Sequence, residues 1–121
     1  RAIGALVPRI PVTEEAIALA VSFARTSRPT AAKAPREVKD YVRYGAGPRG
    51  SQAMVLAAKA RAALRGEAAA DVEDIRAVLV PALRHRIVLS YEALAEGVSA
   101  DTILDSVIGT VPVPEVSLAR P

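Results

Sequence analysis

Apolar residues recur at helical spacing along most of the chain, and the first such run starts at Thr13. Thr13 is a good N-cap, and Glu14 and Glu15 behind it suit the positive end of a helix dipole, so we predict a helix to about Ser27. Its apolar side chains occupy two faces, which predicts burial on two sides. These are Ile17, Ala20, Val21 and Ala24 on one face, and Ala16, Leu19 and Phe23 on the other.

The clearest helical pattern runs from Pro48 to about Arg65. Gly66 is well placed to end that helix, because glycine readily adopts the left-handed conformation behind a basic last turn. Arg61 and Arg65 lie opposite the apolar arc. The residues predicted to form this arc are Ala53, Leu56, Ala57, Ala60, Ala63 and Leu64.

Three further helix starts carry a capping residue, namely Asp71, Ser90 and Ser99. Asp74 follows Asp71 at the spacing of a capping box, and Pro81 is expected to kink or restart that helix. The remaining features are the apolar stripe of Ile75, Val78 and Leu79, a β-like run at Ile87–Leu89, a short helix from Ser90 through Glu96 that ends at Gly97, and the buried face of Ile103, Leu104, Val107 and Ile108.

Proline-containing segments separate and flank these helices. Residues 1–12 are predicted to be an extended entry segment, and residues 110–121 a proline-containing tail. Arg28–Pro35 is predicted to be a surface loop, and Arg36–Tyr44 a short helix. The start at Arg1, without a methionine, is typical of a piece of a longer protein. We therefore expect one folded domain over residues 13–109.

Composition favours an all-α fold. Hydrophobic residues make up 51% of the 121 residues, but aromatic residues make up only 3%. Many of the hydrophobic residues are alanine, the best helix former. We predict a small helical bundle of about four to six helices. Its core is modest, since each alanine buries little area.

Charge and chemistry exclude several classes of function. A net charge of +3 is mild and argues against a nucleic-acid partner. The chain has no cysteine and one histidine, His85, so no metal site is expected. Apolar runs are too short to span a membrane and no signal peptide is visible, which makes a cytoplasmic location the default. The sequence shows no nucleophile–base pair, so we predict no catalytic residue.

The most informative segment is Gly47-Pro48-Arg49. Proline is favoured at the first helical position, so Gly47 is predicted to be the N-cap and Arg49 to lie in the first turn. A cation is poorly placed there, because the amino end of a helix already carries partial positive charge. An anion would satisfy both the guanidinium and the free amides, so Arg49 is a candidate phosphate ligand. The pattern is short, however, and a solvated arginine behind a turn is the alternative.

Several segments, in order, resemble MoxR-type AAA+ ATPases. The run YVRYGAGPRGSQAMVLAAKARAALRG, residues 41–66, is similar to the family's lid segment, with a glycine-rich turn, a Pro-Arg pair and an alanine-rich helix. Asp71–Ile75, Val80–Arg86 and Glu96–Asp101 are similar to further family segments, and Ile10–Arg25 fits the family's first lid helix. The chain departs in having Gly47 where many relatives have serine, and a plain connection at Glu67–Ala70.

The resemblance implies a C-terminal helical lid on an α/β ATPase domain that this sequence does not contain. Arg49 would then be the sensor-2 arginine, which reaches the γ-phosphate of ATP, with Gly47 and Pro48 beside it. The ATPase domain would bind Mg²⁺, since the chain has no P-loop. The implied partners are that domain, adjacent subunits of a ring and an unidentified client protein. In this chaperone-like setting the fragment alone would not hydrolyse ATP.

Other cationic and aromatic residues keep two interpretations. Arg84-His85-Arg86 could contact the ATPase domain, another subunit or an acidic partner. We favour a structural role, in which the aliphatic parts of these side chains cover apolar surface and the charged ends stay in solvent. Tyr41 and Tyr44 could pack near a nucleotide base or belong to the core. The alternative function is a stand-alone helical module that binds DNA or an acidic protein. The residues that would serve it are Arg61, Arg65, Arg84 and Arg86.

Overall fold

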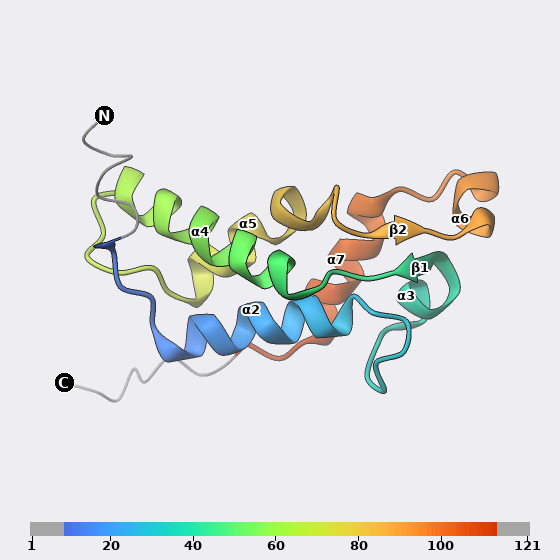
Figure 1. The fold of residues 1–121 in the computed structure, drawn as a ribbon, viewed down its shortest axis with the longest axis horizontal. Helices are drawn as coiled ribbons and strands as arrows, with labels where there is room; N and C mark the ends of the chain where they lie inside the picture. The colour runs from blue at the N-terminus through green and yellow to red at the C-terminus, as the bar shows by residue number, and fades with distance from the viewer. Residues whose placement is uncertain (1–8, 114–121) are drawn as a thin grey trace.

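The computed structural model describes residues 9–113, which form six helices and one two-stranded sheet (Figure 1). The elements are α2 (Glu14–Thr26), α3 (Arg36–Tyr41), β1 (Val42–Tyr44), α4 (Pro48–Leu64), α5 (Val72–Leu83), β2 (Val88–Leu89), α6 (Tyr91–Glu96) and α7 (Ala100–Thr110). This confirms the predicted all-α bundle. The outer parts of the predicted entry segment and tail, residues 1–8 and 114–121, lie outside the described residues.

The core lies where α2, α4 and α5 pack against one another, with α7 packed on α3 and α5. Figure 1 shows the short elements α3, β1, β2 and α6 gathered at one end of this bundle, on the right of the view. Alanine and glycine line much of α4, which lets its neighbours approach closely. The largest fully buried side chains include Leu19, Phe23, Met54, Ile75, Leu79, Leu83, Ile103 and Leu104.

Helix ends follow the sequence closely. The hydroxyl of Thr13 accepts a hydrogen bond from Ala16 N at 3.1 Å, and Ser90 and Ser99 cap α6 and α7 in the same way. Asp71 and Asp74 form the predicted capping box at the start of α5. α5 continues through Pro81 to Leu83. The predicted caps are therefore confirmed, including glycines with positive φ behind α4 and at the end of α6, which are Gly66 and Gly97.

The predicted buried face of α4 is wrong. Leu56 is 57% exposed and Leu64 is 71% exposed. The buried residues instead recur every fourth position, and they are Gly50, Met54, Ala58 and Ala62. Alanines surround the helix, so the sequence did not distinguish one side from another. The small residues at three of these positions, Gly50, Ala58 and Ala62, allow the close packing on α2 and α5.

Two further predictions need correction. Only one face of α2 is buried, because Ile17 is 45% exposed and Val21 is 39% exposed. The helix predicted over Arg36–Tyr44 ends at Tyr41, and Val42–Tyr44 forms strand β1. This strand pairs antiparallel with β2, the predicted β-like run, as Val42 opposite Leu89 and Tyr44 opposite Val88. Strand pairing across a long sequence separation thus overrides the local helical pattern.

A buried ion pair joins the end of α4 to the start of α5. Asp74 accepts hydrogen bonds from Arg61 at 2.6 Å and from Arg65 at 2.9 Å, while its side chain is 2% exposed. Its second oxygen accepts from Asp71 N at 3.0 Å. One carboxylate therefore serves the capping box and both arginines, which compensates for its burial.

Candidate anion-binding site

The segment Gly47-Pro48-Arg49 lies as the sequence predicts. Gly47 is the N-cap of α4 in extended conformation, Pro48 is the first helical residue, and no side chain caps this helix end. Arg49 is exposed in the first turn. The amino end of α4 therefore combines uncapped amides with a guanidinium, a combination that suits an anion.

The turn before α4 is held firmly against the end of α2. Ser27 Oγ accepts a hydrogen bond from Ala46 N at 2.9 Å, and Arg28 Nε donates to Ala46 O at 2.8 Å. A Cβ on Gly45 would lie 2.5 Å from Ser27 O, so only glycine fits this close approach. These contacts fix the position from which α4, and with it Arg49, begins.

Gly50 brings the start of α4 against the end of α5. A Cβ at Gly50 would lie 2.7 Å from the Cβ of Ala46 and 3.0 Å from Leu83 Cδ2. The missing side chain therefore permits direct packing on Leu83, the last residue of α5. The residues that follow Leu83 are thereby carried to the same end of the bundle as Arg49.

An open hollow of about 610 Å³ results at this junction. It is lined by Gly47, Pro48, Arg49, Gly50, His85 and Arg86. Two segments far apart in sequence thus contribute cationic or hydrogen-bonding side chains to one surface, and no carboxylate from residues 9–113 lines it. The sequence analysis noted His85 and Arg86 but favoured a structural role and did not join them to Arg49.

The cluster Arg84-His85-Arg86 is divided in the structure. Arg84 binds the carboxylate of Asp101 with two hydrogen bonds, of 2.8 and 3.0 Å, and so ties the turn behind α5 to α7. The Arg84 hydrogen bond lowers the pKa of Asp101, and the pair raises the pKa of Arg84. Arg86 instead lines the hollow. Within residues 9–113, neither Arg49 nor Arg86 takes part in an ion pair.

The tyrosines lie elsewhere. Tyr41 donates a hydrogen bond to Glu96 Oε1 at 2.8 Å, which raises the pKa of the phenol. Tyr44 is 60% exposed, and Arg43 stacks over its ring at 5.3 Å from the centroid. Neither tyrosine lines the hollow beside Arg49. Their contacts are with α6 and with a neighbour in the same strand.

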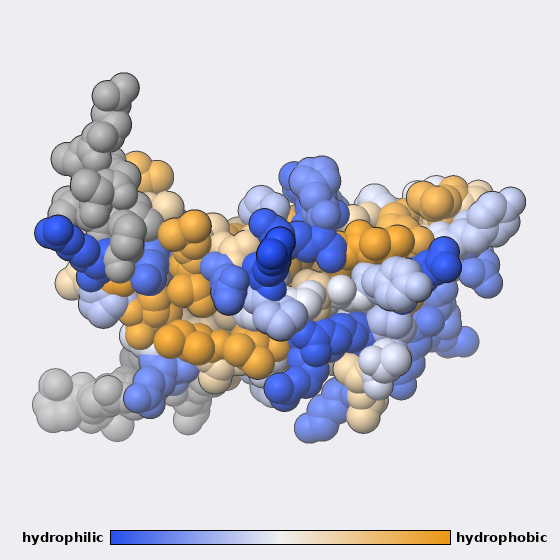
Figure 2. All heavy atoms as spheres, in the orientation of Figure 1, coloured by the Kyte–Doolittle hydropathy of each residue, from blue (hydrophilic) through white to orange (hydrophobic). Residues whose placement is uncertain are grey.

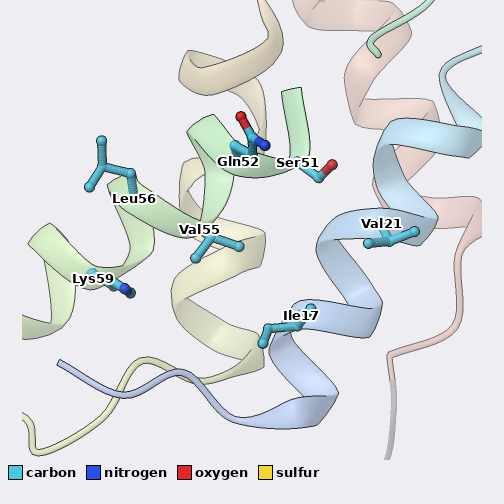
Figure 3. Close-up of a pocket in the computed structure, with 7 residues that line it drawn as sticks. All are labelled: Ile17, Val21, Ser51, Gln52, Val55, Leu56 and Lys59. Atoms are coloured by element: carbon cyan, nitrogen blue, oxygen red, sulfur yellow. The ribbon is translucent and has the colours of Figure 1, made fainter. Parts of the chain in front are cut away.

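A second, apolar hollow of about 420 Å³ lies between α2 and α4 (Figure 3). Its walls include Ile17, Val21 and Leu56, exposed apolar side chains that the sequence analysis had placed on buried faces. The partly buried Val55 also lines it. Figure 2 shows apolar surface gathered over this part of the molecule. Lys59, Ser51 and Gln52 complete the lining of this hollow, and its mainly apolar wall has the chemistry of a packing surface.

Comparison with known proteins decides the family. A family model described as the AAA lid domain matches residues 34–107, a range that includes Arg49, His85 and Arg86. The chain belongs to the AAA lid domain family. Within it, the chain resembles the MoxR proteins. It is 38% identical to the chaperone MoxR1 of Mycobacterium tuberculosis over 81 residues, which cover 67% of this chain. It is 44% identical to protein MoxR of Paracoccus denitrificans over 75 residues, which cover 60% of this chain.

The lid has a solved counterpart with the same fold. A crystal structure assigned as an ATPase of Cytophaga hutchinsonii matches 90% of the chain with a TM-score of 0.83 and 28% identity. The lid spans 22% of the length of both MoxR relatives and 33% of this crystallised chain. These findings confirm the resemblance to a MoxR-type AAA+ lid.

Three further features concern membranes, metal ions and acidic partners. Within residues 9–113, no helix combines the length and apolarity needed to cross a membrane. The same part of the lid holds no group of three or more side chains suited to a metal ion. Of the four arginines named for DNA or acidic-protein binding, Arg61, Arg65 and Arg84 are paired with carboxylates, which leaves much less free positive charge for that function.

Proposed function

We propose that this lid reads the nucleotide state of a MoxR-like AAA+ ATPase through Arg49, acting as the sensor-2 arginine. The supporting observation is that Arg49 stands at the uncapped amino end of α4, beside a hollow that no carboxylate of the described residues lines. Such a guanidinium can bind a phosphate group with two parallel hydrogen bonds, one to each of two oxygens. The relatives' names, a MoxR chaperone and an ATPase, support the setting.

The residues of the hollow fit one part of ATP. Arg49 and the first amides of α4 suit phosphate oxygens, whereas the residues that line the hollow offer no carboxylate for Mg²⁺ and no phenylalanine, tyrosine or tryptophan ring for the base. Magnesium and the rest of the nucleotide would therefore be held by the α/β ATPase domain. Bound ATP supplies the negative charge that holds Arg49, and hydrolysis releases it.

Movement of the lid follows from this arrangement. Loss of the terminal phosphate would remove the counter-charge of Arg49 and weaken the contact between lid and ATPase domain. In a ring of subunits, each lid would pass this change to its neighbours and so to a client protein. The proposal makes the lid a coupling element of a chaperone-like, ATP-hydrolysing assembly without catalytic residues of its own.

The test is the Arg49→Ala substitution in the full-length protein that carries this lid. We expect ATP turnover to fall by about tenfold to hundredfold, since the lost group would stabilise charge on the transferred phosphate. Arg36→Ala is the matched control, because Arg36 is an exposed arginine whose side chain is 91% accessible and pairs only with Asp40 in its own helix. Normal turnover in Arg49→Ala would overturn the proposal.

A further inference from the structure

The hollow beside Arg49 brings together cationic side chains from two separate elements. Arg49 comes from the first turn of α4, while His85 and Arg86 come from the turn that links α5 to β2. The carbonyl end of α5 favours cations behind it, but the amino end of α4 does not. Arg49 and Arg86 therefore face a shared hollow without a counter-charge among the described residues.

Among the described residues, Arg9, Arg25, Arg28 and Arg43 also form no ion pair, but the hollow brings two unpaired arginines from separate elements to one surface. Five other arginines have carboxylate partners: Arg36, Arg61, Arg65, Arg76 and Arg84. The contrast is sharpest within one turn. Arg84 is bound by Asp101, whereas Arg86, two positions later, lines the hollow. The Arg84–Asp101 pair fixes the turn, so it positions Arg86 rather than competing for an anion.

We propose that Arg86 and His85 form, together with Arg49, a bipartite site for the phosphate chain of a nucleoside triphosphate. Arg86 contributes a planar fork of donors, and His85 contributes an imidazole N–H. The identity of the ligand rests on the proposed function, while the joint anion site rests on the geometry of the hollow. Contacts from two elements make anion binding sensitive to how α4 sits against the end of α5.

The first experiment uses this 121-residue chain with sodium tripolyphosphate as the probe. An NMR titration at low ionic strength should shift the amides of Arg49, Gly50, His85 and Arg86 with a single saturation curve. Arg86→Ala and Arg49→Ala should each raise the Kd by about fivefold, as for exposed ion pairs. Arg36→Ala should leave it unchanged, and circular dichroism should show that each variant keeps its helix content.

Two results would overturn the bipartite site. One is a titration in which only the amides of Arg49 and Gly50 shift. The other is an Arg86→Ala variant that binds tripolyphosphate as tightly as the original chain. Arg86→Lys is an internal check: it keeps the charge but not the fork, so its Kd should lie between those of the original chain and Arg86→Ala.

The second experiment identifies the ligand in the full-length protein. If Arg86 contacts the terminal phosphate, Arg86→Ala should raise the Kd for ATP about fivefold and that for ADP less. Equal effects on ATP and ADP would overturn that contact. The two proposals fail separately. If Arg49→Ala impairs turnover but Arg86→Ala leaves tripolyphosphate binding unchanged, only the bipartite site is overturned. If Arg49→Ala has normal turnover but Arg86→Ala weakens tripolyphosphate binding, only the sensor function is overturned.

Discussion

Arg61 of α4 and Asp74 of α5 form a hydrogen-bonded ion pair of 2.6 Å in which the carboxylate is almost fully buried. Arg65 adds a second bond to the same oxygen at 2.9 Å. The pair joins the end of one helix to the beginning of the next, opposite the end of α4 that carries Arg49. It anchors the helix whose other end forms the proposed anion site.

Removal of this carboxylate should destabilise the lid. Asp74→Ala leaves Arg61 and Arg65 without their shared partner and also removes the acceptor for Asp71 N, so we expect a loss of about 3 kcal/mol in the free energy of unfolding. Urea unfolding followed by circular dichroism measures it. Glu73→Ala is the control, because Glu73 lies in the same turn but is 66% exposed and should cost less than about 1 kcal/mol. Equal losses in both variants would contradict the assigned role of Asp74.

The turn before α4 offers a pair of glycines with opposite expectations. Gly45→Ala places a methyl group 2.5 Å from Ser27 O and should cost about 2–3 kcal/mol, because backbone must shift to admit it. A Cβ at Gly47 meets no atom within 4 Å, so Gly47→Ala should cost less than about 1 kcal/mol. Thermal unfolding of the two variants distinguishes them. A tolerated Gly45→Ala would show that the turn is not held against α2 as described.

The Arg84–Asp101 pair predicts a pH dependence. Because Arg84 lowers the pKa of Asp101 in the folded lid, the pair adds stability above the unfolded-state pKa of a carboxyl group, about 4, and this stability is lost as pH falls through the folded value. The difference in unfolding free energy between the original chain and Asp101→Asn should thus be constant near neutral pH and shrink in acid. In an Arg84→Gln background, Asp101→Asn should show no such dependence. A difference that grows on acidification would reverse the assigned sign.

Sequence reasoning succeeded where structure depends on neighbouring residues. The caps at Thr13, Asp71, Ser90 and Ser99 follow from short polar side chains that bond nearby amides, and these bonds form in the structure. The same reasoning placed Gly47, Pro48 and Arg49 correctly at the start of a helix. Local chemistry was sufficient in each of these cases.

It failed where tertiary packing decides between equivalent choices. An alanine-rich helix such as α4 has no strongly apolar side, so Leu56 was placed in the core although Met54 and Ala58 are buried instead. Arg49 and Arg86 line the same hollow because Gly50 packs against Leu83. The spacing of apolar residues in the sequence does not reveal that contact. Half of the candidate site was thus predictable from its own segment, and half required the fold.

Helix α4 is packed closely on its neighbours at Gly50 and is held by ion pairs to Asp74 at Arg61 and Arg65, so it connects two distant parts of the lid. Its 17 residues span about 25 Å, at a rise of about 1.5 Å per residue. A tilt of the whole lid by about 10° around the Arg61–Asp74 end of α4 would carry Arg49, about 18 Å away along the helix, through about 3 Å, roughly the length of a hydrogen bond. A small pivot at a place remote from any ligand is therefore enough to make or break a contact at the opposite end of the helix.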